Sequence, residues 1–478
     1  MTGQLKLKVE DVRFHERHVR LRMPFRFGIV TLTEAPQAFV RVNIRLGDGT
    51  LAMGQSAEMF APKWFDKNPV LTNDQNFDQL RTSLAIARRH YLEEGGERTA
   101  FGLHAAVSPM QYAACAAAGL NGLIAGFGTA LIDRAILDAL CRASDVSVFD
   151  AVRQNLPGID AATTPDLEGF DLAGFLSRLR PASTIHARHT VGLVDSITER
   201  EIAPETRIND GLPESLEAVV ASYGHRYFKL KVGGDTEADI DRLKAIASVL
   251  DRIADPYFVS LDGNEQYQDA DAVIALLKRI GEEPALARLL SAILYIEQPI
   301  TRAQALEKPI HDLAALKPVA IDESDADIGV FPKAKELGYT GISSKSCKGF
   351  YRSVLNRARV EKWNSAQASS RYFMIAEDLT TQAGVAVQQD LALATLIGCT
   401  HIERNGHHYV DGMAGASQHE QDRFLAAHPD LYHKANGRTR IRIEGGELAI
   451  KSLAAAGLGT SVEPDWAKMA EKHYEVTP

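Results

Sequence analysis

Three acidic residues stand where successive β-strands are expected to end. Apolar residues precede Asp262, Glu297 and Asp322, and loop-forming residues follow each of them. If neighbouring parallel strands bring these carboxylates to one edge, they repel one another and raise each other's pKa. An all-oxygen set of this kind suits Mg²⁺ or Mn²⁺, and no His or Cys stands at these strand ends to favour zinc. We therefore predict a site for Mg²⁺, with Mn²⁺ as the other candidate.

Lysines stand at the ends of two further predicted strands. Lys229 and Lys231 are two residues apart on one strand, so both side chains point to the same face. Lys345 ends a later strand, and we expect it across the opening of the fold. A lysine beside a cation and other lysines has a lowered pKa and acts as a general base at neutral pH. Metal and lysines together predict removal of the proton α to a substrate carboxylate, with the cation stabilising the enolate.

Short apolar runs alternate with amphipathic helical stretches from about residue 182 onward. Strands are predicted at residues 186–194, 226–232, 257–262, 294–297, 318–322, 341–345, 372–376 and 400–403. Helices are predicted between them, for example at 236–253, 270–280, 351–363 and 383–397. Strands linked by helices are typical of parallel βαβ units. Eight of them favour an α/β fold that is a closed (β/α)₈ TIM barrel, whose catalytic residues gather at the carboxyl ends of the strands.

The two ends of the chain have a different texture. Alternation at 38–44 and a Gly47-Asp48-Gly49 turn predict a hairpin, and helices are predicted at 76–94, 108–118 and 128–142. We therefore predict an α+β capping domain at residues 1–125, a barrel at 126–410, and a C-terminal segment at 411–478 that returns to the capping domain. Strand-like stretches at 440–443 and 445–450 are expected to pack on that domain.

Composition narrows the class of protein. The chain has 478 residues, of which 45% are hydrophobic, and a formal charge of −9, so we expect a large globular protein with small-molecule rather than nucleic-acid partners. Its four cysteines are widely spaced, which predicts no disulfides and a cytoplasmic location. We expect no membrane span and no signal peptide, because no long apolar run occurs. We also expect a homo-oligomer.

The order of the motifs carries a resemblance to a known family. KLK at 229–231, LDGN at 261–264, IEQP at 296–299, IDES at 321–324 and ISSK at 342–345 follow one another, each separated by about one helix–strand unit. This set resembles the enolase superfamily, and most of all the muconate-lactonizing-enzyme subgroup of the mandelate racemase/muconate lactonizing enzyme family. Residues 131–139 resemble its helix before the barrel, and 457–459 resemble its C-terminal return to the capping domain.

The resemblance implies a role for each candidate residue. Asp262, Glu297 and Asp322 would hold the metal, and Lys231 and Lys345 would be the acid/base pair. Lys229 would support Lys231 electrostatically or bind the substrate carboxylate. Residues expected beside the metal or the substrate are Asn264, Glu323 and Glu377. The product would arise by epimerisation or racemisation, by cycloisomerisation or by dehydration.

Several features depart from that pattern. Lys348 stands close to Lys345 and is a rival for the base at strand six. Asp262 and Glu297 are 35 residues apart, which predicts an extended helix or an insertion at 279–290. No Asp-x-Asp follows strand eight, which disfavours a dipeptide epimerase.

Two further segments have open interpretations. Three histidines lie on or just after the last predicted strand, namely His401, His407 and His408. Their spacings are weak patterns for metal ligands, so we favour a rim or interface role over a metal site. Residues 58–65 resemble a capping loop that closes over the barrel mouth, but their aromatic side chains are equally consistent with core packing.

Two other kinds of function remain open. One is an aldolase barrel in which Lys231 or Lys345 forms a Schiff base with the substrate. The other is a non-catalytic barrel that only binds metal, which predicts lost ligands or bases.

Overall fold

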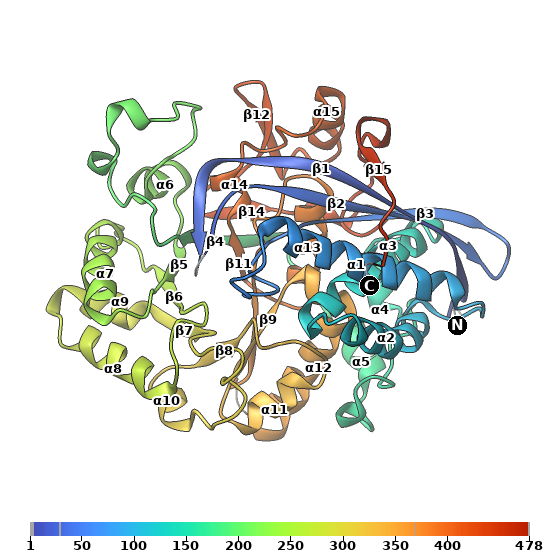
Figure 1. Cartoon of the computed structure of the whole chain (residues 1–478), viewed down its shortest axis with the longest axis horizontal. Helices are drawn as coiled ribbons and strands as arrows, with labels where there is room; N and C mark the ends of the chain where they lie inside the picture. The colour runs from blue at the N-terminus through green and yellow to red at the C-terminus, as the bar shows by residue number, and fades with distance from the viewer. Residues whose placement is uncertain (1–3, 28–29, 369, 477–478) are drawn as a thin grey trace.

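A closed barrel of eight parallel strands forms the centre of the molecule (Figure 1). The computed structural model describes residues 4–27, 30–368 and 370–476. The barrel strands are β4 (Thr184–Val191), β5 (Tyr227–Lys231), β6 (Phe258–Asp262), β7 (Ile293–Glu297), β8 (Val319–Ile321), β9 (Gly341–Ser344), β10 (Phe373–Ala376) and β11 (His401–Arg404). They pair in sequence order, and β11 pairs with β4 to close the barrel. The predicted TIM barrel is confirmed, and each expected strand overlaps an observed one.

Helices connect the strands and cover the outside of the barrel. The clearest are α7 (Thr236–Leu250), α8 (Ala270–Gly281), α12 (Phe350–Gln367) and α13 (Val385–Leu396). Asp235 and Asp269 cap the first two by accepting a hydrogen bond from a first-turn N–H. The long gap between Asp262 and Glu297 is not spanned by one extended helix, because α8 ends at Gly281 and η4 (Pro284–Leu286) and α9 (Ala287–Ala292) follow it; an insertion relative to the family stays a prediction.

An antiparallel sheet and three helices form the capping region. The sheet contains β1 (Leu7–Phe27), β2 (Val30–Leu46) and β3 (Leu51–Met59), and the helices are α1 (Asn73–Glu93), α2 (Ala100–Ala117) and α3 (Gly122–Ala143). Caps at Thr72, Thr99 and Asn121 begin these helices. In Figure 1 the long blue strands β1 and β2 reach the barrel beside α14 (Gly406–Tyr409), where Phe25 stacks on Tyr409 with ring centroids 4.2 Å apart. The capping region is thereby fastened to the carboxyl end of the barrel.

The C-terminal segment contacts both parts of the molecule. β15 (Ala470–Lys472) pairs with β1 and completes the antiparallel sheet. The expectation that residues 445–450 pack on the capping domain is wrong, because β14 (Glu447–Ala449) pairs antiparallel with barrel strand β4. β12 (Tyr432–Ala435) and β13 (Arg438–Ile441) form a separate hairpin. The domain boundaries at 125/126 and 410/411 stay predictions.

Side-chain burial agrees with the composition. All four cysteines are free thiols, and three of them, Cys115, Cys141 and Cys347, are buried. Within the described residues, none of the helices combines the length and apolar character needed to cross a membrane.

Candidate active site

Strand alternation divides β5 between the inside and the outside of the barrel. Lys229 and Lys231 point to the interior, whereas Phe228 and Leu230 pack in the hydrophobic layer under the helices. Both lysines reach the same carboxylate, since Asp262 Oδ2 lies 2.8 Å from Lys229 Nζ and 2.6 Å from Lys231 Nζ. The prediction that the two lysines share a face is confirmed.

Lys229 lies at the centre of a cluster of carboxylates. Its ammonium is 2.8 Å from both Asp262 and Glu297, 2.6 Å from Glu377 and 3.2 Å from Glu403. These groups come from four different strands or their ends, and all are at most 2% exposed. The buried ammonium of Lys229 therefore compensates much of the negative charge of these four carboxylates, which form the inner layer of the site.

Lys231 belongs to a second hydrogen-bond chain nearer the opening. Its ammonium donates to Asn264 Oδ1 at 2.6 Å, and Asn264 Nδ2 donates to Glu323 Oε1 at 3.0 Å. The Asn264 backbone has φ +40°, a strained conformation for a residue with a side chain, and its N–H donates to Asp262 Oδ1 at 2.8 Å. The strained turn thus places the amide and the carboxylate on either side of the lysine.

The two rival lysines after β9 occupy different positions. Lys345 donates to Asp322 Oδ2 at 2.7 Å and lines the central cavity. Lys348 donates to the backbone oxygen of Asp322 and to Ser343 Oγ, both at 2.7 Å, and lies 3.3 Å from Asp325 Oδ2. Lys348 is absent from the lining of that cavity. The geometry therefore favours Lys345 as the group that meets a substrate.

Three contributors were missed by sequence reasoning. Gln298 Oε1 accepts the backbone N–H groups of Asp322 and Ser324, at 2.8 and 3.0 Å, and so holds the end of β8. Arg188 donates to Glu377, and Glu403 accepts from both Lys229 and the hydroxyl of Thr190. Gln298 could have been found from its place in the IEQP motif. Arg188 and Glu403 could have been found from the period-two alternation along β4 and β11.

Burial and ion pairing set the protonation preferences of the inner layer. Burial alone would raise the pKa of Asp262, but Lys229 and Lys231 outweigh it and the pKa is lowered. The pKa of Glu297 is raised well above its usual range, first by burial and then by Asp262 and Glu377. Mutual repulsion therefore acts as predicted on Glu297, while the lysines reverse it at Asp262.

The carboxylates around Lys229 and Lys345 raise the pKa of both lysines, and the lowering expected beside a metal cation stays a prediction. Burial lowers the pKa of each, but the surrounding carboxylates reverse its effect and both values are raised. Asp322 is the principal partner for Lys345, and Asp262 is the first of four for Lys229. These ion pairs oppose the lowering that a neighbouring metal cation would cause.

The three predicted metal ligands come from adjacent strands but do not converge tightly. Asp262, Glu297 and Asp322 follow β6, β7 and β8, and each contacts a lysine. Within the described part of the chain, they do not form a group whose ligand atoms all lie within 4.8 Å of one another. Glu297 Oε2 is nevertheless buried without a hydrogen-bond partner, and the donor set is entirely oxygen. This chemistry fits a hard divalent cation that shares the carboxylates with the lysines.

A small cavity of about 30 Å³ lies between the barrel mouth and the capping region. Its polar lining includes Lys229, Lys231, Asn264, Lys345 and Glu403. Its apolar lining from the capping region includes Phe25, Leu32, Ala61 and Trp64. Glu377 and Glu323 are buried but do not line it.

The side chains of segment 58–65 occupy both of the positions considered for them, and its role as a closing loop stays a prediction. Trp64 lies over the barrel mouth with Lys345 Nζ 4.4 Å from its ring centroid. Phe60 instead packs against Phe77 and Phe127 in the core of the capping region. Arg302 donates to the backbone oxygens of Trp64 and Phe65 at 2.8 and 2.9 Å, which ties the segment to the barrel.

The histidines on and after β11 lie in different surroundings. His401 lies beside Arg188, whose guanidinium is 2.5 Å from His401 Nδ1. His407 and His408 lie on α14, directly after β11 and in contact with β1, and both are buried against His189, so their rim or interface role stays a prediction.

The chain is similar to a known protein family over more than half of its length. Residues 211–466 match the family model described as "Enolase C-terminal domain-like", which covers more than half of the chain. No curated protein sequence matches the chain.

Solved structures share the complete architecture. A muconate lactonizing enzyme from Mycobacterium smegmatis, complexed with muconolactone, has a TM-score of 0.58 and 18% identity over 96% of this chain and 98% of that one. A dipeptide epimerase from Enterococcus faecalis, complexed with Mg and a dipeptide, has a TM-score of 0.58 and 15% identity over 95% and 99%. An enolase superfamily member from Roseovarius nubinhibens, complexed with magnesium, has a TM-score of 0.55 and 15% identity over 98% and 99%. These similarities show the fold.

Proposed function

The chain belongs to the enolase superfamily, with its mandelate racemase and muconate lactonizing enzyme-like members, and from this premise we propose that it removes the proton α to the carboxylate of a small organic acid with the help of Mg²⁺. Members of the superfamily are isomerases and lyases. One observation carries the proposal: Lys231 and Lys345 line the same cavity from different strands. Two amines placed in this way serve the two faces of one α-carbon.

The carboxylates at the ends of β6, β7 and β8 would hold the cation. Bound there by Asp262, Glu297 and Asp322, Mg²⁺ supplies positive charge to the substrate carboxylate as negative charge accumulates on it. Glu297 Oε2, which has no partner of its own, is the oxygen most available to such an ion. Gln298 holds the Asp322 backbone in place through two hydrogen bonds.

The lysines would transfer the proton. Asn264 and Asp262 hold the Lys231 ammonium between them, and Asp322 and the Trp64 ring hold Lys345. One of the two lysines would take the α-proton in its neutral form, which requires that its carboxylate partner be bound to the cation instead. The other, protonated, lysine would return a proton, or a leaving group would depart, so that racemisation, cycloisomerisation or elimination results. Lys229 compensates the charge of the inner carboxylates.

The cavity also indicates the kind of acid. Its volume of about 30 Å³ holds only a few water molecules, so a substrate must push the apolar side chains of the capping region outward. Phe25, Leu32 and Trp64 form this movable side, which favours an acid with an apolar portion. Closure over such a substrate would exclude water during proton transfer.

The test is exchange of substrate α-hydrogen with deuterium from D₂O. Carboxylic acids with an α-hydrogen are screened with Mg²⁺ and wild-type protein, followed by Lys231→Ala and Lys345→Ala. We expect exchange by the wild type and a loss of about 10² to 10⁴-fold in each variant. Exchange that survives both substitutions would refute the two-base proposal.

Two controls separate the other kinds of function. Borohydride treatment with carbonyl compounds traps a Schiff-base lysine, and we expect no adduct at Lys231 or Lys345. Calorimetric titration with Mg²⁺ should give binding that Glu297→Gln abolishes. Unchanged binding in that variant would contradict the placement of the metal and favour a barrel without this active site.

A further inference from the structure

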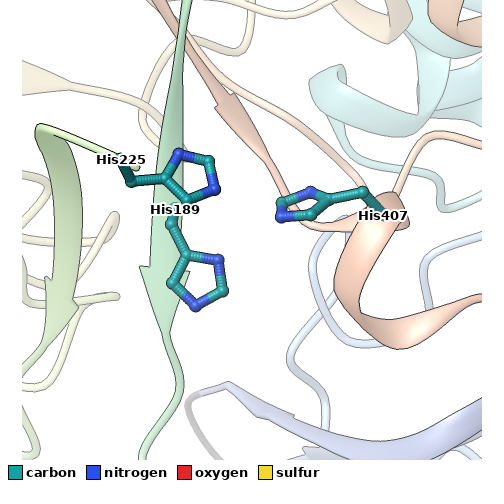
Figure 2. Close-up of side chains that lie close together, drawn as sticks. All are labelled: His189, His225 and His407. Atoms are coloured by element: carbon teal, nitrogen blue, oxygen red, sulfur yellow. The ribbon is translucent and has the colours of Figure 1, made fainter. Parts of the chain in front are cut away.

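Three histidines from distant parts of the sequence face one another on the outside of the barrel (Figure 2). His189 lies on β4, His225 lies just before β5, and His407 lies on α14. Their ring centroids form a nearly equilateral triangle, with separations of 5.4, 5.6 and 5.5 Å. One nitrogen from each ring lies within 4.8 Å of the other two, and within the described residues no other three such side chains meet this condition.

This group is separate from the candidate active site. Its strand neighbours Arg188 and Thr190 contact Glu377 and Glu403 inside the barrel. Alternation along β4 therefore turns His189 to the outer face. The barrel wall lies between the two sites, so no side chain belongs to both.

The hydrogen bonds leave the imidazole nitrogens free to act as ligands. His225 Nδ1 lies 2.9 Å from the backbone oxygen of Ala187, which can only accept, so the proton is on Nδ1 and Nε2 carries a lone pair. This arrangement is the usual support for a metal-bound histidine. Among the residues that the structure describes, no hydrogen-bond partner is present for the buried His225 Nε2, His189 Nδ1 and both ring nitrogens of His407.

Unpartnered buried nitrogens carry a free-energy cost that a bound ion removes. Buried polar atoms in native proteins nearly always have a partner, and the three side chains are only 1% to 7% exposed. Three such orphans that point to one location are therefore better explained by a shared ligand than by three separate defects. Ion binding requires the nitrogens to approach to about 3.4 Å, as tetrahedral bonds of about 2.1 Å demand.

We propose that His189, His225 and His407 form a second metal site, selective for a zinc-class transition ion. Three imidazoles without a carboxylate or thiolate suit Zn²⁺, Co²⁺, Ni²⁺ or Cu²⁺ and not Mg²⁺, which requires oxygen ligands. His407 also lines a cavity of about 150 Å³, which provides an entry path and room for water as the fourth ligand.

The nearby arginines do not oppose a bound cation with uncompensated charge. Arg22 lies near His407 but pairs with Asp210, to which it donates at 2.5 and 2.9 Å. Arg404, which also lies near His407, is paired with Asp390. Each positive charge near the site therefore has its own carboxylate.

The ion would fasten the barrel where it closes. β11 pairs with β4 in parallel, with Arg404 opposite His189, and β4 pairs in turn with β5, with His189 opposite Phe228. The three ligands come from β4, from the residues that lead into β5 and from the turn after β11. A metal at their centre links the first, second and last strands of the barrel, and so acts as a structural clamp.

The test is binding of Zn²⁺ and of Co²⁺ to the folded protein in the presence of saturating Mg²⁺, which occupies oxygen-only sites. Calorimetry measures the Zn²⁺ stoichiometry, and the visible absorption of Co²⁺ reports tetrahedral nitrogen coordination. We expect one ion per chain. His225→Asn and His407→Asn should each weaken binding by at least about 100-fold, whereas Glu297→Gln should bind normally.

A matched variant controls for the loss of any buried histidine. His428 is also fully buried but bonds only to Ser452, away from the group, so His428→Asn should bind Zn²⁺ like the wild type. Circular dichroism verifies that each variant is folded. Anomalous X-ray scattering from Zn²⁺-soaked wild-type crystals provides a measurement independent of substitution, and we expect its peak among the three rings. Three results would overturn the proposal: no Zn²⁺ binding by the wild type, binding as tight as wild type in both His225→Asn and His407→Asn, or an anomalous peak only at the barrel mouth.

Discussion

Two buried clusters of titratable groups lie on opposite faces of one barrel wall. On the inner face, Lys229 contacts four carboxylates, and charge is compensated by opposite charge. On the outer face, within the described ranges 4–27, 30–368 and 370–476, His189, His225 and His407 have neither a carboxylate nor one another as hydrogen-bond partners. Burial lowers the pKa of each of these histidines, so they remain neutral.

The difference shows two physical solutions to one problem. Transfer of a charge into the protein interior is costly unless the charge is paired or removed. The inner face keeps its charges by pairing them, as the proposed proton transfer and metal binding require. On the outer face the three histidines are neutral instead, and their ring nitrogens offer lone pairs. Adjacent residues Arg188 and His189 show how a single strand supplies both faces.

The largest effect is expected from loss of an amine that faces the substrate. Lys345→Ala should slow α-hydrogen exchange by about 10² to 10⁴-fold, because a proton donor and acceptor is removed. Lys348→Ala is the matched comparison: it removes contacts to Asp322 but no amine from the cavity. We expect its main effect in Mg²⁺ affinity, by about 10 to 100-fold. Exchange rates and calorimetry distinguish the two, and the reverse pattern would identify Lys348 as the base.

Removal of the central inner cation should destabilise the metal-free fold. Lys229→Met leaves four buried carboxylates without their shared partner, and we expect the free energy of unfolding to fall by about 3–5 kcal/mol. Added Mg²⁺ should restore part of this loss, because it supplies positive charge to the same carboxylates. Urea unfolding with and without Mg²⁺ measures both. Lys317→Met at the opposite end of β8 is the control, and an equal loss there would show that the cluster is not special.

Acid should destabilise the outer cluster. Burial lowers the pKa of His225 to about 4, below the 6.5 of an exposed histidine. Because the folded-state pKa is lowered, the contribution to stability is complete above pH 6.5 and is lost as the pH falls toward 4. The loss reaches about 3 kcal/mol. Unfolding of the metal-free protein across this pH range should be less pH-dependent in His225→Leu than in the wild type. Identical profiles would contradict the assignment.

The smallest effect is expected where the capping region covers the cavity. Trp64→Leu removes the ring that lies 4.4 Å from Lys345 Nζ. Trp64 also supplies apolar lining to the cavity, and loss of about 1 kcal/mol of contact with the substrate corresponds to about a fivefold increase in KM. Trp363 packs against Phe331 and Tyr372 away from the cavity, so Trp363→Leu should leave KM unchanged. Equal effects of the two substitutions on KM would place Trp64 outside the substrate site.

Local pattern was sufficient for the barrel strands and for most inner residues. Period-two alternation identified β5 and put Lys229 and Lys231 on one face, and the residues that end β6, β7 and β8 identified the acids. Ring closure between β11 and β4 was predicted only as a class of fold. Its detailed consequence, the approach of Glu403 to Lys229, depends on residues 174 positions apart.

The histidine group shows what one-dimensional pattern cannot contain. His407 was noticed with its sequence neighbours His401 and His408, whereas its actual partners, His189 and His225, lie far away in the chain. The choice between Lys345 and Lys348 likewise depended on which ammonium reaches the cavity and which lies behind Asp322. The ion pairs that raise the pKa of Lys229 and Lys345 likewise depend on the distances between strands, which local pattern does not contain.

By itself the sequence determined the eight-stranded barrel, the identity of its inner acids and lysines, and the family to which the chain belongs. These depend on periodicity and on residue types at strand ends, which are local properties. Only the tertiary structure decided which charges pair, which lysine faces the cavity, where the C-terminal strands attach and which histidines meet. Those outcomes depend on contacts between residues distant in sequence, and the Coulomb and desolvation energies that govern them change steeply with separation and burial.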